Sequence, residues 1–144
     1  MTSIKGFRHS GLVCYDINKS LYFYKNLLGF KVIQDFSDNS EYINKILGTK
    51  NETFHMIKLR AKDGNILELI NYQTQGSKGL KKNIHDSGIS HMAFEVDHID
   101  EFYEFLQKNG VTFISEPVLS SEGFAKVCNC LDPDGIRIEI VEIL

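Results

Sequence analysis

The chain carries one pattern of residues twice, once in each half. Residues 7–32, FRHSGLVCYDINKSLYFYKNLLGFKV, are echoed by residues 89–113, ISHMAFEVDHIDEFYEFLQKNGVTF, and each copy has a histidine early in an apolar run. A second echo follows, DGNILELI at 63–70 and DGIRIEIV at 134–141, with a glutamate five residues after the aspartate. Because a repeated unit must bury its apolar face against a neighbour, the duplication restricts the chain to folds made of two equivalent modules.

Each half predicts a strand, a helix and three further strands. Apolar residues at helical spacing predict one helix per half, ending at Gly29 and at Gly110. Strands are predicted at 8–15, 30–34, 53–60 and 65–72 in the first half, and at 89–96, 111–115, 125–131 and 136–143 in the second. Loops are expected at 35–52, with a short helical piece at 42–47, and at 116–123.

This organisation predicts an α+β protein with one domain spanning residues 1–144. The domain is expected to consist of two modules, at about 5–74 and 88–144, joined by a polar, glycine-containing linker over residues 73–88. One strand–helix–three-strand module cannot cover both faces of its sheet. We therefore expect the two modules to pair into a partly closed, eight-stranded cup.

Composition excludes several classes of protein. The formal net charge is −3 and no Lys/Arg-dense patch is present, which argues against a nucleic-acid partner. No apolar run is long enough to cross a membrane, and the N-terminus lacks the apolar core of a signal peptide. The three cysteines are odd in number and lack CxxC spacing, so we expect reduced thiols in a cytoplasmic protein.

The repeated histidines and glutamates are expected on one side of each sheet. Because side chains alternate along a strand, His91 lies opposite Met92 and Phe94, and Glu139 lies opposite two isoleucines. The same alternation separates His9 and Glu68 from the apolar residues that would pack under the helix. All four are therefore predicted on the inner face of the cup.

Two imidazoles and two carboxylates on an inner surface indicate a metal site. Buried carboxylates need a counter-charge, and a divalent ion held by His9, Glu68, His91 and Glu139 would provide one. Mixed nitrogen and oxygen ligands suit zinc, nickel, cobalt, manganese or iron. A single strand histidine or glutamate is more often structural, so the hypothesis depends on the recurrence of the pair in both halves.

Other polar residues are weaker candidates. Glu95 shares the predicted face of His91 and is a candidate substrate contact or base. Glu142 competes with Glu139 as a ligand but falls outside the repeated spacing and on the other face. His55 has no echo in the second half and is expected in the core or at the rim, whereas Cys128 and Cys130 are expected to be structural.

The chain resembles the vicinal oxygen chelate superfamily along nearly its whole length. The resemblance rests on His9 with the following DINKSLYFYKNLLGF, on LELINY around Glu68, on GISHMAFEVDHID around His91, and on LDPDGIRIEIVE around Glu139. It implies the paired βαβββ, glyoxalase-like fold, a divalent metal that binds adjacent oxygens of a small-molecule substrate, and a homodimer. The His–Glu–His–Glu ligand set is similar to that of glyoxalase I.

This resemblance implies a metal-dependent lyase or isomerase that transfers a proton next to a carbonyl. The ion would polarise a substrate oxygen and stabilise an enediolate-like intermediate, and Glu139 or Glu68 would act as general base. The alternatives are a methylmalonyl-CoA-epimerase-like racemase, a ring-cleaving dioxygenase, and a non-catalytic small-molecule binding or resistance protein.

Overall fold

A computed structural model describes residues 3–79 and 83–144. The chain divides into two compact units, Met1–Lys78 and Gly79–Leu144, each of which is described by itself. The linker predicted over residues 73–88 includes positions 80–82, which lie outside the described residues. None of the helices in the described part of the chain has the length and apolar character needed to cross a membrane.

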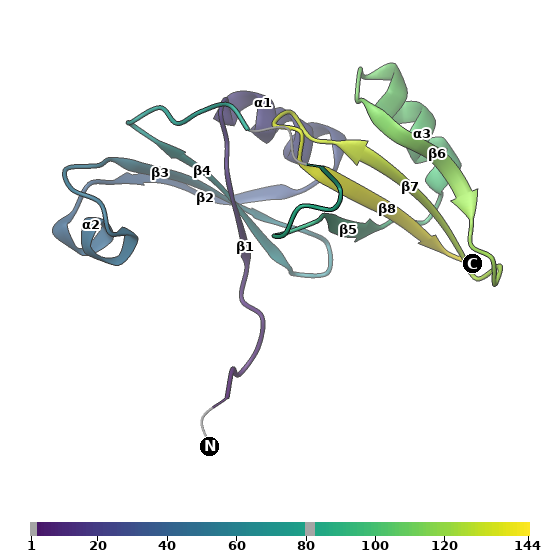
Figure 1. The fold of residues 1–144 in the computed structure, drawn as a ribbon, viewed down its shortest axis with the longest axis horizontal. Coiled ribbons are helices and arrows are strands. Elements are labelled where there is room, and N and C mark those ends of the chain that lie inside the picture. Colours follow the sequence, from purple (N-terminus) through teal and green to yellow (C-terminus); the bar gives the residue numbers. More distant parts are fainter. Residues whose placement is uncertain (1–2, 80–82) are drawn as a thin grey trace. The chain divides into compact units, whose positions relative to one another are not determined.

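The first unit is a four-stranded sheet with helical segments. Along the chain it contains β1 (Ser10–Val13), α1 (Ile17–Leu21), the π-helical segment η1 (Tyr22–Leu27), β2 (Lys31–Asp38), α2 (Glu41–Leu47), β3 (Phe54–Arg60) and β4 (Ile66–Tyr72). The strand order is β1-β4-β3-β2; β1 runs parallel to β4, and the other pairs are antiparallel. The first strand of the unit thus lies beside its last (Figure 1).

The second unit repeats this topology. It contains β5 (Met92–Glu95), α3 (Ile99–Lys108), β6 (Phe113–Leu119), β7 (Ala125–Leu131) and β8 (Arg137–Ile143), in the order β5-β8-β7-β6. Again the first strand is parallel to the last, and the hairpin pairs are antiparallel. The described residues therefore form two open four-stranded sheets with helices, which confirms the predicted α+β class and the repeated strand–helix–three-strand order.

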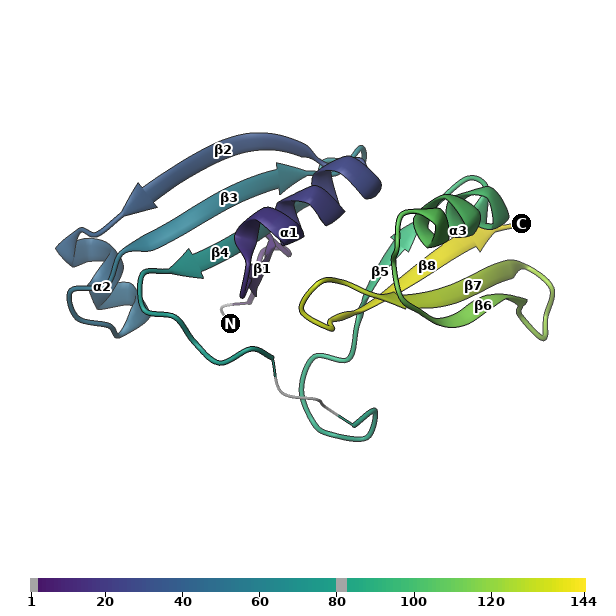
Figure 2. The ribbon, with the colours of Figure 1, turned by 90° about the horizontal axis from the view of Figure 1, so that it is seen from above.

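Each sheet has an apolar side that packs against the helix of its own unit. In the first unit α1 lies along β4, where Leu67 and Leu69 are buried (Figure 2). In the second unit α3 packs on β6 and β8, and its Ile99 and Leu106 are buried with Ile138 of β8. Period-two alternation then turns the intervening residues of β4 and β8, among them the glutamates, to the other side.

The ends of the helices follow from their sequences. Asp16 caps α1 because its carboxylate accepts hydrogen bonds from the backbone N–H groups of Asn18 and Lys19, at 3.1 and 3.2 Å. α3 ends at Lys108, with Asn109 as its C-cap, and Gly110 follows with a φ of 79°, a left-handed conformation that glycine adopts without steric cost. In the first unit the predicted single helix is only partly right, because after Leu21 it widens into the π-helical segment η1.

Two predicted loops are partly strand. β2 continues to Asp38, whereas the prediction ended that strand at Gln34 and placed a loop from residue 35. β6 extends to Leu119 and includes Pro117, which was predicted to lie in a loop. Proline is tolerated there because β6 is the edge strand and its register with β7 shifts between Ser115 and Val118. The helix predicted at 42–47 is confirmed as α2.

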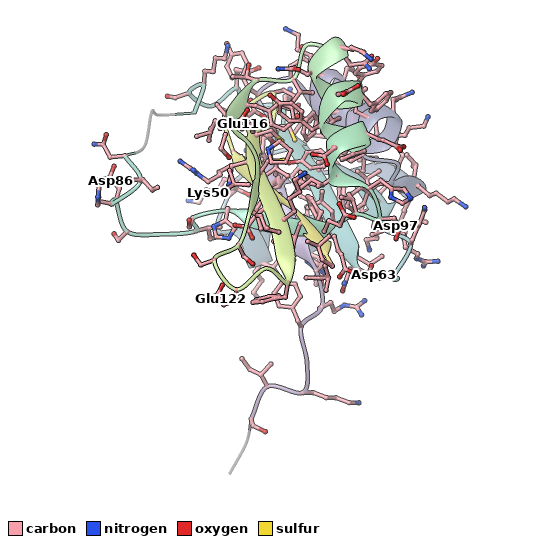
Figure 3. The ribbon with its side chains drawn as sticks, turned by 90° about the vertical axis from the view of Figure 1, so that its right-hand side faces the viewer. Lys50, Asp63, Asp86, Asp97, Glu116 and Glu122 are labelled. Carbon is pink, nitrogen blue, oxygen red and sulfur yellow. The ribbon has the colours of Figure 1, made fainter. Side chains whose placement is uncertain are left out.

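Two tight turns place the glutamate-bearing strands. In the β3–β4 turn the Asp63 side chain, labelled in Figure 3, accepts a hydrogen bond of 2.9 Å from the backbone N–H of Asn65. In the β7–β8 turn Asp132 accepts from the N–H groups of Asp134 and Ile136, at 2.9 and 2.8 Å. The aspartates at these hairpins therefore have a structural role, which is to fix the start of β4 and of β8.

Candidate metal centre

The first unit brings His9 and Glu68 together. His9 immediately precedes β1, and Glu68 lies on β4 opposite Gly11, two residues further along β1. The imidazole Nε2 of His9 lies 3.4 Å from Oε2 of Glu68. Gly11 has no side chain, so nothing from that position of β1 stands between the two groups. A separation of 59 residues along the chain (68 − 9) is thus closed by the parallel β1–β4 ladder.

The second unit forms the equivalent pair. His91 immediately precedes β5, and Glu139 lies on β8 opposite Ala93, again two residues beyond the histidine. Nε2 of His91 lies 3.7 Å from Oε2 of Glu139. The same atoms approach in both units because the same parallel ladder, with the same register, carries them. The prediction that each histidine shares a face with the glutamate of its own half agrees with these contacts.

The two spacings fit donor atoms of one metal ion. Imidazole nitrogen and carboxylate oxygen bind ions such as Zn²⁺ at about 2.0–2.2 Å. Two such donors on a tetrahedral ion are then about 3.4 Å apart, close to the 3.4 Å of His9–Glu68 and the 3.7 Å of His91–Glu139. Each unit therefore presents a nitrogen–oxygen pair that is compatible in chemistry and in spacing with two positions of a coordination sphere.

Each pair contains two candidate ligands, and the structure groups no larger set. Among residues 3–79 and 83–144, no three His, Cys, Asp or Glu side chains gather as a metal-binding cluster. The combination of His9, Glu68, His91 and Glu139 into one four-ligand site accordingly stays a prediction. What the structure adds is that neither pair requires residues from the other unit.

Lys58 is a residue of the first site that sequence reasoning missed. It lies on β3 directly opposite Glu68, and its Nζ is 3.5 Å from Oε1 of that carboxylate. The Glu68 side chain is only 10% exposed, so a nearby cation offsets part of the cost of burying its charge. Lys58 therefore already supplies Glu68 with a counter-charge, so burial of this carboxylate does not by itself require a metal ion.

Ser90 was also missed and orients the histidine of the second unit. Its hydroxyl lies 2.9 Å from Nδ1 of His91, while Nε2 of the same ring faces Glu139. Hydrogen bonding at one ring nitrogen fixes the imidazole and directs the other nitrogen toward a ligand. A search for residues shared by both halves could not find Ser90, because the matching position in the first half is Arg8.

The remaining candidates have other partners or positions. Glu142 accepts a hydrogen bond of 2.9 Å from the backbone N–H of Ile99 and so caps α3 on the opposite side of β8 from Glu139. His55 is partly exposed, and its Nε2 lies 2.7 Å from Oδ1 of Asp35. Glu95 is exposed at the end of β5, on the same face as Glu139, and its proposed role in substrate binding stays a prediction.

The cysteines of β7 are not placed for nucleophilic or metal chemistry. Cys128 and Cys130 are buried on the helix-facing side of the second sheet. Burial raises the pKa of Cys128 to about 11, and the carboxylate of Asp100 adds to this. Burial likewise raises the pKa of Cys130 to about 12, with contributions from Cys128 and Asp132. Both thiols stay protonated near neutral pH, in keeping with a structural role.

Comparison with known proteins gives the family. Over 140 residues the chain is 29% identical to a lactoylglutathione lyase of Schizosaccharomyces pombe, covering 92% of this chain and 46% of that protein, so it spans about half the length of this relative. It is 27% identical to a lactoylglutathione lyase of Salmonella typhimurium, with 93% and 90% covered. The crystal structure of a glyoxalase family protein from Bacillus cereus superposes with a TM-score of 0.89 at 19% identity, over 99% of this chain and 97% of that one. Residues 6–140 match the Glyoxalase/Bleomycin resistance protein/Dioxygenase superfamily, and the chain belongs to that superfamily.

Proposed function

We propose that the protein is a divalent-metal-dependent lyase or isomerase of the glyoxalase I-like type, which transfers a proton next to a carbonyl of a small substrate. The single observation that carries the proposal is the recurrence of the His–Glu pair, with the same atoms, at equivalent places in both units. Two related proteins named lactoylglutathione lyase support the reaction class. The proposed ligands are His9, Glu68, His91 and Glu139.

A bound divalent ion would supply Lewis-acid polarisation of the substrate carbonyl. The chain itself would contribute the base. Among the described residues, the ionic contacts of Glu139 are limited to His91, and its side chain is 28% exposed. Glu68 is held between His9 and Lys58 and is more buried. Glu139 is therefore better placed to take a proton at a carboxylate oxygen and return it, with Glu68 as the second candidate base.

The histidines would hold the site rather than move protons. Ser90 engages Nδ1 of His91, which leaves Nε2 as the nitrogen that faces the glutamate. A ring fixed in this way donates its lone pair in a defined direction, which favours ligation. The proposal also includes a homodimer in the cytoplasm, an expectation that rests on family resemblance and that size determination in solution would test.

Metal content tests the proposal directly. The purified protein should contain a stoichiometric divalent ion by elemental analysis, and Glu139→Gln and His91→Ala should each weaken its binding by more than about tenfold. Glu142→Gln is the matched control, because Glu142 is on the same strand but caps α3. Formation of lactoylglutathione from glutathione and a small 2-oxo aldehyde should fall with metal content. Unchanged metal binding in both site variants would refute the proposal.

A further inference from the structure

The two His–Glu pairs differ in charge. On β3, Lys58 lies opposite Glu68, whereas on β7 the residue opposite Glu139 is Asn129. Both neighbours stand at the same register position of equivalent hairpins, so the contrast is between an ammonium group and a neutral amide. The cation of the first unit is therefore an addition to the repeated pattern and requires its own explanation.

Lys58 is placed to contact a ligand as well as Glu68. Its Nζ is 3.5 Å from Oε1, longer than the usual 2.7–2.9 Å or so of a charge-assisted hydrogen bond. An ammonium group has three donors, and its side chain is 24% exposed. The Lys58 ammonium therefore has N–H groups left to donate to a ligand beside the His9–Glu68 pair.

The surroundings strengthen any charge interaction made by Lys58. Toward the Phe54 end of β3, the next residues on the same face are Met56 and Ile70, which lie opposite each other in the β3–β4 register. In the other direction the next residues are Arg60 and Ile66, and Gln34 of β2 lies opposite Lys58. Met56 is buried and joins a cluster with Ile43 and Phe54, against which Ile70 packs. An ammonium beside apolar groups attracts an anion more strongly than one surrounded by water.

Charge balance at the loaded site also favours an anion. A divalent ion is neutralised by the two glutamates, and the two histidines bind metals as neutral imidazoles. Lys58 then leaves one net positive charge beside the ligands. We infer that Lys58 binds an anionic group of the substrate, so that the substrate class is a small carboxylate- or phosphate-bearing carbonyl compound. This inference deepens the proposed function and rests on it.

The test compares two probes that differ in charge. Lactate and its neutral amide, lactamide, share a hydroxyl and an adjacent carbonyl oxygen, and calorimetric titration of the metal-loaded protein gives the ratio of their affinities. We expect wild type to prefer lactate and Lys58→Met to reduce that preference by roughly tenfold. Lys58→Arg should retain most of it. Lys58→Gln, with a polar side chain, repeats the test if Lys58→Met folds poorly.

Lys126→Met is the matched control. Lys126 is a strand lysine of similar exposure, 27%, but it pairs with Asp100 of α3 on the helix side of its sheet. The Lys126→Met variant should leave the ratio of the affinities for lactate and lactamide unchanged. A ratio in Lys58→Met within twofold of wild type would overturn the inference, as would a loaded wild type that shows no preference for lactate.

Metal analysis of the same samples separates this inference from the proposed function. A wild type without bound metal refutes the metal-dependent function, and the anion inference falls with it, because without the ion the two glutamates outweigh the charge of Lys58. A metal-loaded wild type whose lactate-to-lactamide ratio is unchanged in Lys58→Met overturns the anion inference alone.

Discussion

Lys58 and Asn129 occupy equivalent positions in their sheets, each directly across the strand pair from a glutamate of a His–Glu pair. The first unit thus has a cation where the second has a neutral amide. The proposed ligands are otherwise the same in both units, one histidine and one glutamate each. Because of the nearby cation, Glu68 should respond differently from Glu139 to mutation and to metal binding.

Replacing Lys58 by Asn should therefore raise the affinity of the protein for divalent ions by about tenfold, because a positive charge next to Glu68 is removed. The metal-free protein should lose about 1–2 kcal/mol of stability, since a largely buried carboxylate loses its cation. Metal titration and denaturant unfolding measure the two effects. Lys126→Asn should leave metal affinity at the wild-type value; lower metal affinity in Lys58→Asn would contradict the charge argument.

The buried thiols of β7 should make the folded protein sensitive to alkali. Their pKa values rise from 9.0 to about 11 for Cys128 and about 12 for Cys130 in the folded state. Between pH 9 and these values the unfolded chain has lost protons that the folded chain keeps, so stability falls as pH rises. The slope is roughly 1.4 kcal/mol per pH unit for each thiol.

Urea unfolding at several pH values between 8 and 11 or so would measure that slope. Lysine and tyrosine also titrate there, so the informative comparison is with Cys130→Ala, in which the slope should be shallower. An unchanged slope would show that the thiols do not carry the effect. Below about pH 8.5 the stabilisation that the protonated thiols provide is fully present and nearly constant.

Two glycines should respond differently to alanine. At Gly11 an added Cβ would lie 3.2 Å from Cδ1 of Ile70, the end of a flexible side chain, and the equivalent residue in the second unit is Ala93. Gly11→Ala should change stability by less than about 1 kcal/mol and leave metal binding intact. Gly29 has a φ of 79°, so Gly29→Ala should cost about 1–2 kcal/mol. Thermal unfolding of both variants separates the effect of the steric contact at Gly11 from the effect of backbone strain at Gly29.

Asn44 should be a sensitive position of the first unit. Its buried amide oxygen accepts hydrogen bonds from the Thr49 hydroxyl and the Glu52 N–H, both at 2.9 Å, and its NH₂ group donates to the Glu52 carbonyl at 3.0 Å. These bonds hold the loop after α2 to the helix. Asn44→Ala should destabilise the protein by about 2–3 kcal/mol, because several loop groups lose their partner.

Ser40→Ala is a useful comparison, since it removes the cap of α2, a hydrogen bond of 3.2 Å that the Ser40 hydroxyl accepts from the Ile43 N–H, together with the hydrogen bond of that hydroxyl to the Asp38 carboxylate. It should cost about 1 kcal/mol. If the two variants unfold with the same m-value, their denaturant midpoints show which of them is the less stable. A smaller effect of Asn44→Ala than of Ser40→Ala would mean that the loop finds alternative partners.

The face of each strand was predictable because it depends only on alternation. Glu139 stands between Ile138 and Ile140, and once those isoleucines are assigned to the core the glutamate has to point away. The repeat then indicated which histidine belongs with which glutamate. Neither inference required knowledge of contacts between residues far apart in the sequence. In the structure, the histidine Nε2 and the glutamate Oε2 of each pair lie within 4 Å of each other.

Features that depend on cross-strand neighbours were not predictable in the same way. Lys58 meets Glu68 only through the register of the β3–β4 hairpin, and a search for residues repeated in both halves passes over a residue whose counterpart is Asn129. The extension of β2 has a similar cause. Phe36 falls in a polar segment, but it packs on the cluster that Phe54 and Ile43 form, and this tertiary contact outweighs the local signal for a loop.

Each His–Glu pair joins the first strand of its unit to the last. During synthesis on the ribosome, the histidine of a unit therefore emerges long before its glutamate, and no donor pair exists until β4 or β8 has been translated and has inserted beside β1 or β5. A nascent chain cannot trap an ion in a half-made unit through these residues. Because the proposed ligands come from both units, metal acquisition would thus report that β4 and β8 have both taken their places.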